Sequence, residues 1–74
     1  MPEVAAKIRD GKVVVCNLTD ETYNLFYKLV RKERIGFEGT LIKAWEHYGE
    51  VSEGALVKYI KRRYPIWYSF NSSL

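Results

Sequence analysis

The most regular hydrophobic pattern in the chain is a run of β-branched residues that ends directly at a helix start. Residues 13–18 read VVVCNL and consist mostly of strong strand formers. The dipeptide Asp10-Gly11 just before them is a common two-residue hairpin turn. The pattern predicts a strand over residues 12–18. Residues 4–8 either pair back onto this strand as a second, weaker one, or lead into it through a plain turn.

A helix start follows the strand without a linker. Thr19 is a favourable N-cap, and the two acidic residues after it place negative charge where the helix dipole stabilises it. Apolar residues then recur at helical spacing from Tyr23 to Val30 and form a broad stripe. The pattern predicts a helix from Asp20 to about Glu33.

Two further helices have recognisable ends. Gly36 is a suitable cap for a helix over 37–48, in which apolar residues again recur at helical spacing. Gly39 weakens the first turn of that helix by roughly 1 kcal/mol relative to Ala, and leaves room for another backbone to approach. Ser52 is a good N-cap for a third helix, which Pro65 is expected to stop. An aromatic tail with a polar end follows.

Composition limits the ways in which this chain can be stabilised. A chain of 74 residues buries only about 60% of its unfolded surface. Cys16 has no second cysteine to pair with, and one cysteine with one histidine makes no metal site. The apolar fraction is 47%, with eleven aromatic residues (two Trp, six Tyr and three Phe). This excess favours either a core shared between two subunits or an aromatic-rich monomer.

The order of elements raises the question of what pairs with the strand. A lone strand with exposed edges invites pairing with another chain. A two-fold dimer answers the question if strand 12–18 pairs antiparallel with its own copy and the helices intertwine beneath it. The expected fold is mainly α with a short β-strand. Its parts are an N-terminal arm or weak hairpin strand (1–11), a core (12–49), and an additional C-terminal helix with the aromatic tail (50–74).

Several short motifs occur in a fixed order across half of the chain. They are a strand ending in Leu18, the helix start Thr19-Asp20-Glu21, the turn Arg34-Ile35-Gly36 and the central pair Ala44-Trp45 of the second helix. In this order and spacing, residues 12–48 resemble the ribbon-helix-helix DNA-binding family, the class of the Arc, MetJ and CopG repressors. The chain departs from the family in two places. It has Arg34 where the family often has Gly, and Gly36 where the family often has Ser or Thr.

The resemblance implies a homodimeric, sequence-specific protein that inserts an antiparallel β-ribbon into the major groove of double-stranded DNA and regulates transcription. Outward-facing strand residues would read bases, and inward-facing ones would build the core. Since side chains alternate along a strand, an inward Leu18 turns residues 14 and 16 inward and residues 13, 15 and 17 outward. Asn17 can bind adenine with two hydrogen bonds, and valines offer only apolar contacts. Lys12 would reach a phosphate.

The two outward valines also fit a second interpretation. Val13 and Val15 could belong to an ordinary buried strand that residues 4–8 or the C-terminal tail cover as another layer. The N-terminus of the second helix adds backbone N–H groups that suit a phosphate, although Glu38 brings an opposing charge there. The candidate DNA-binding residues are Lys12, Val13, Val15, Asn17, Gly36, Phe37, Lys61, Arg62 and Arg63.

Charge is unevenly distributed along the chain. Residues 1–53 carry eight Lys/Arg and nine Asp/Glu, whereas residues 54–74 carry four basic residues and no acidic one. These four cations are either a solvated helix face or extra phosphate contacts that would make DNA binding depend on salt. They are Lys58, Lys61, Arg62 and Arg63.

Two other function classes fit parts of the sequence. One is a protein-interaction module such as an antitoxin, which would dimerise by the same fold and bind a protein through residues 51–74. The other is a monomeric winged helix, which is disfavoured because its wing would precede all of the helices. We find no catalytic signature, and we expect neither an enzyme nor a cofactor.

The lack of a recognisable targeting signal points to the cell interior. The sequence has no signal peptide and no apolar run of the roughly 20 residues that a membrane span needs, so no membrane partner is expected. With the lone cysteine, this predicts a cytoplasmic protein. The absence of Gln and the abundance of Lys, Glu and Arg lean toward a thermophile.

Overall fold

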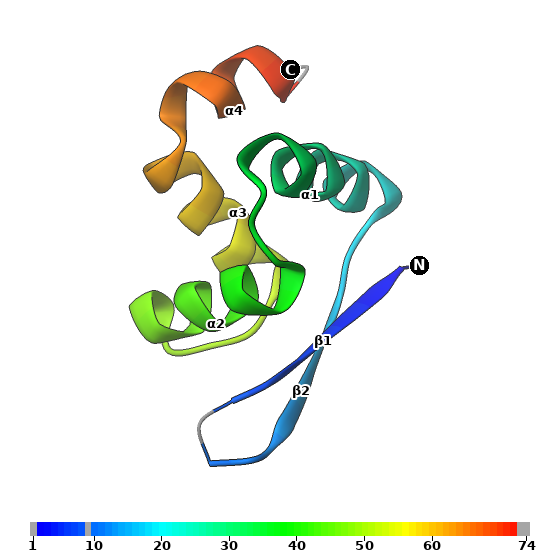
Figure 1. Cartoon of the computed structure of the whole chain (residues 1–74), viewed down its shortest axis with the longest axis vertical. Coiled ribbons are helices and arrows are strands. Elements are labelled where there is room, and N and C mark those ends of the chain that lie inside the picture. The colour runs from blue at the N-terminus through cyan, green and yellow to red at the C-terminus, as the bar shows by residue number, and fades with distance from the viewer. Residues whose placement is uncertain (1, 9, 73–74) are drawn as a thin grey trace.

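The computed structural model describes residues 2–8 and 10–72, in which an antiparallel hairpin precedes a group of helices (Figure 1). The fold is therefore mainly helical with a small sheet. Its elements in chain order are β1 (Glu3–Lys7), β2 (Val13–Asn17), α1 (Asp20–Glu33), α2 (Phe37–Tyr48), α3 (Glu53–Arg63) and α4 (Pro65–Asn71). In Figure 1 the hairpin lies at one end of the molecule and α4 at the other.

The N-terminal residues form the second strand, which decides between the two alternatives left by the sequence. β1 pairs with β2 antiparallel, and Ala5 lies opposite Val15. The connecting turn uses Gly11 at a φ of 89°, a conformation that glycine adopts without steric cost. The Gly11 N–H donates to the carbonyl oxygen of Ile8 at 2.9 Å. One edge of β2 is thus occupied within the chain itself.

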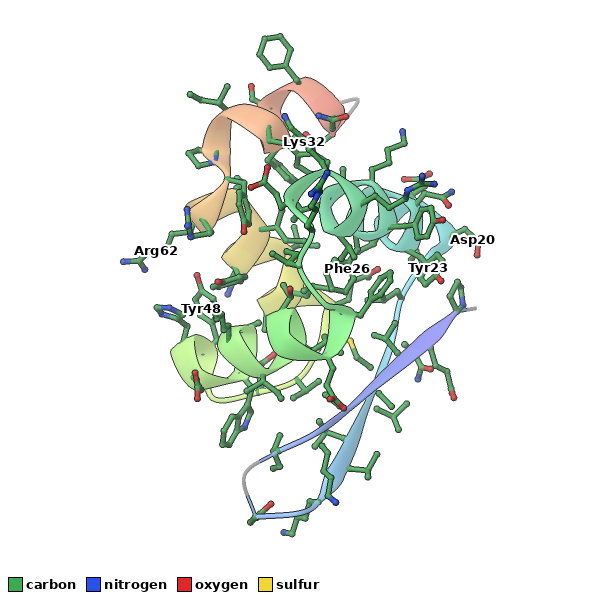
Figure 2. All side chains as sticks on the ribbon, in the orientation of Figure 1. Asp20, Tyr23, Phe26, Lys32, Tyr48 and Arg62 are labelled. Carbon is green, nitrogen blue, oxygen red and sulfur yellow. The ribbon has the colours of Figure 1, made fainter. Side chains whose placement is uncertain are left out.

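The core lies between the inner face of the hairpin and the helices. Its largest members are fully buried, and Figure 2 shows one of them, Phe26, between α1 and α2. Residues from α3 complete this core, so its apolar side chains are buried without a second subunit. The core cluster consists of Ala6, Cys16, Leu18, Phe26, Leu29, Leu41, Leu56 and Ile60.

Helix ends follow the local signals in the sequence. The Thr22 N–H donates to the Thr19 hydroxyl at 3.2 Å, and the Ala55 N–H donates to the Ser52 hydroxyl at 3.1 Å, so both expected N-caps are confirmed. Arg34 ends α1 in the left-handed conformation, with φ 55° and ψ 42°. This is the position at which the resemblance leads one to expect glycine.

The C-terminal segment differs from the expectation of a single added helix and an aromatic tail. Residues Pro65–Asn71 form a fourth helix, α4. Pro65 ends α3 as predicted, but it also occupies the first turn of α4, where a missing N–H costs nothing because that group has no intrahelical partner. Trp67 and Tyr68 pack against the core from this helix.

Candidate nucleic-acid interface

The outer face of the hairpin is open to solvent. Val13 is 64% exposed and Val15 is 51% exposed, so the interpretation that another layer covers them is wrong. Residues 3–7 lie beside β2 in the same sheet rather than over it. The face consists of three cross-strand pairs of exposed residues, Glu3 with Asn17, Ala5 with Val15, and Lys7 with Val13. Lys12, just before β2, is exposed as well.

The inner face carries the residues that the alternation assigned to it. Val14 is half-buried, Cys16 is 2% exposed and Leu18 is fully buried. Burial raises the pKa of the Cys16 thiol, and the negative charge of Glu53 raises it further. Cys16 is therefore a core residue that stays protonated and unreactive near neutral pH.

One edge of β2 has no partner among the described residues. The Leu18 N–H donates to the Pro2 carbonyl oxygen at 2.9 Å, just beyond the paired strands. Hydrogen-bonded and non-bonded pairs alternate along an antiparallel ladder, so residues 14 and 16 direct their backbone groups toward β1. The backbone groups that point to the open edge belong to Val13, Val15 and Asn17.

The opposite edge of the sheet is closed by α2. By the same alternation, the Lys7 N–H points away from β2, and it donates to the Glu38 carboxylate at 3.1 Å. Helix α2 packs along β1 in this region. Consequently, the edge of β2 is the side of the sheet on which a further strand can pair.

The N-terminus of α2 lies beside the hairpin, but it is a weaker candidate for binding a phosphate than the sequence suggests. Gly36 is exposed and gives no side-chain cap. The Phe37 ring packs edge-on against Phe26, with 4.6 Å between ring centres, and stacks on Tyr23 at 5.9 Å. Phe37 is therefore a packing residue whose backbone N–H alone could meet a phosphate. The Glu38 carboxylate adds negative charge in the same turn.

A contact between distant segments fixes the point where the hairpin meets the helices. The Glu53 carboxylate, at the start of α3, accepts hydrogen bonds from the Thr19 N–H at 2.9 Å and from the Thr19 hydroxyl at 3.0 Å. The bond from the Thr19 backbone is the main cause that holds the pKa of Glu53 below its usual range. Sequence patterns did not reveal this contact, because Thr19 and Ser52 each explain their own helix start locally.

The three candidate cations of α3 lie away from the hairpin. Lys61, Arg62 and Arg63 are exposed, and Figure 2 shows Arg62 pointing out from the molecule. Arg62 follows Glu53 by nine residues, which is about 14 Å along the helix at 1.5 Å per residue. Within one chain, the structure brings Lys12, Val13, Val15 and Asn17 together on the hairpin and leaves these cations on a separate surface.

Other kinds of site find no support in the described part of the chain. Among these residues no group of three or more His, Cys, Asp and Glu side chains could hold a metal ion. None of the described helices has the length and apolar character that crossing a membrane requires. Comparison with family models, curated proteins and solved structures finds no match to this chain.

Proposed function

We propose that the protein binds double-stranded DNA as a homodimer, in which β2 of each chain pairs with β2 of the other along the open edge. The observation that carries this proposal is the combination of an unpaired β2 edge with an exposed outer face on the same strand. The resemblance of residues 12–48 to ribbon-helix-helix proteins also supports it. A transcriptional regulator is the function that this assembly would serve.

The open edge restricts how two copies can pair. Residues 13, 15 and 17 must pair with one another so that their free N–H and C=O groups meet and the inner face stays inward. Full overlap of the two strands centres the two-fold axis on Val15. Val15 then faces Val15 of the second chain, and Val13 faces Asn17. The result is a four-stranded antiparallel sheet in the order β1, β2, β2, β1.

The dimensions of such a sheet suggest how it meets DNA. Four strands spaced about 4.8 Å apart measure about 14 Å between the outer two, whereas the major groove is about 12 Å wide and admits only a two-stranded ribbon. The central β2 pair therefore faces the base edges. The outer β1 strands face the phosphate walls, where Lys7 of each chain is exposed.

Asn17 is the residue of this face that is suited to reading a base. In the proposed register, the two copies of Asn17 each lie two residues from the two-fold axis, about 14 Å apart at 3.4 Å per residue. This corresponds to about four base pairs at 3.4 Å per base pair. We expect a palindromic site with an adenine in each half, separated by roughly that distance.

Selection from random duplexes, followed by mobility shift of the enriched sequence, tests this proposal. Asn17→Ala should weaken binding to the enriched site by about 1–3 kcal/mol and leave binding to random duplex unchanged. Asn24→Ala removes the same side chain from the exposed surface of α1 and serves as the control. Failure to bind any duplex at low salt would contradict the proposal.

A further inference from the structure

Helix α4 leaves an apolar face uncovered at the end of the molecule opposite the hairpin (Figure 1). Ile66 is 74% exposed and Phe70 is 86% exposed. The two residues are four apart and so lie on the same side of the helix. Trp67 and Tyr68 hold the other side of α4 against the core. The exposed pair therefore projects from a helix that is anchored behind it.

Positive charge lies next to helix α4. The Lys61 ammonium lies 5.9 Å from the ring centre of Tyr68, and the Arg63 guanidinium lies 5.0 Å from that of Tyr64, at the start of α4. These ring contacts place Lys61 on the core-facing side of α4 and Arg63 at its N-terminal end, so both cations lie next to the helix that carries the exposed pair. The chain has no acidic residue after Glu53, so no carboxylate within α4 or the rest of α3 neutralises them.

We propose that α4 and its flanking cations bind the surface of an acidic lipid bilayer. A seven-residue helix cannot cross the membrane, but it can lie in the interface with its apolar side chains among the acyl chains. Lys61 and Arg63 then lie within reach of anionic headgroups. This proposal departs from the expectation of no membrane partner and does not depend on DNA binding.

A bilayer fits this surface better than a partner protein does. Stable protein interfaces bury about 800 Å² on each partner, typically with 20–30 residues a side. The exposed apolar part of α4 consists of two side chains on a short, projecting helix, and the charges in the adjoining last turn of α3 are of one sign. A planar, acidic and deformable surface can take up such a projection without a matching pocket.

Sedimentation with lipid vesicles tests the proposal. The intact chain should bind vesicles of phosphatidylcholine mixed with phosphatidylserine, and bind pure phosphatidylcholine vesicles at least tenfold more weakly. Ile66→Ser with Phe70→Ser should reduce binding to the acidic vesicles about tenfold or more, because the inserted apolar area is lost. Lys61→Ser and Arg63→Ser should each reduce it about fivefold.

Matched controls separate insertion from simple charge attraction. Val13→Ser removes an exposed apolar side chain from the opposite end and should leave vesicle binding unchanged. In a Trp45→Phe and Trp67→Phe background, lipids with brominated acyl chains should quench the fluorescence of a tryptophan introduced by Phe70→Trp. Binding that survives loss of Ile66 and Phe70, or an absence of binding to acidic vesicles, would overturn the proposal. The Ile66 and Phe70 variant should still bind DNA, so failure of one proposal leaves the other standing.

Discussion

The contact between Glu53 and Thr19 makes stability depend on pH in a defined way. Glu53→Gln removes the negative charge and keeps one oxygen that can accept a hydrogen bond. Charge-assisted hydrogen bonds contribute about 1.5–3 kcal/mol each. Glu53 is half-exposed, and water weakens its interactions, so the expected loss in the free energy of unfolding is only about 1 kcal/mol at pH 7.

The sign of the pH dependence follows from the direction of the pKa shift. The pKa of Glu53 is lower in the folded chain than its usual value of 4.5. Its stabilising contribution is therefore fully present above pH 4.5, and it is lost as the pH falls through the lowered, folded-state pKa. The stability difference between the wild type and Glu53→Gln should shrink over that acid range and vanish once Glu53 is protonated in the folded state.

Urea unfolding of both proteins at a series of pH values measures this difference. Protein concentration must stay fixed, because dimer formation would add to the apparent stability. Glu50→Gln is a suitable control, since Glu50 is exposed and accepts a hydrogen bond from Ser52, only two residues away. Equal stability of the wild type and Glu53→Gln at pH 7, or a difference that persists unchanged into acid, would refute the reasoning.

Three further substitutions or reactions test local features. Arg34→Gly should raise the free energy of unfolding by about 0.5–1 kcal/mol in urea titration, because a left-handed non-glycine residue costs about 1–2 kcal/mol. Gly39→Ala should also stabilise the fold, by up to about 1 kcal/mol in the same titration, since a Cβ there meets nothing within 4 Å. Cys16 should react with a disulfide reagent only after unfolding, as a spectrophotometric thiol assay would show.

Features set by neighbouring residues could be predicted from the sequence. The alternation along residues 13–18 assigned inner and outer faces correctly, because a strand turns successive side chains to opposite sides. Thr19 and Ser52 marked helix starts because their side chains bond to the backbone three residues later. These rules need no knowledge of the rest of the fold.

Features that depend on distant contacts could not be predicted in this way. The sequence does not identify the strand that pairs with β2, because Asp10-Gly11 fits both a hairpin and a plain turn. No neighbouring residue in the sequence indicates that Glu53 accepts a hydrogen bond from Thr19. The same is true of Glu38, which accepts one from the Lys7 N–H. The sequence does not reveal helix α4, because Pro65 is suited both to stopping one helix and to the first turn of the next.

Disulfide formation at position 15 tests the proposed dimer most directly. In the register centred on Val15, the two Cα atoms of this residue lie about 5.5 Å apart, which is within the range for a disulfide. In a Cys16→Ala background, Val15→Cys should form a cross-linked dimer on mild oxidation, and that dimer should still bind the enriched duplex. Val13→Cys should not form a cross-linked dimer, because its two copies would lie about 14 Å apart. Equal cross-linking at both positions, or a cross-linked dimer that no longer binds DNA, would contradict the account.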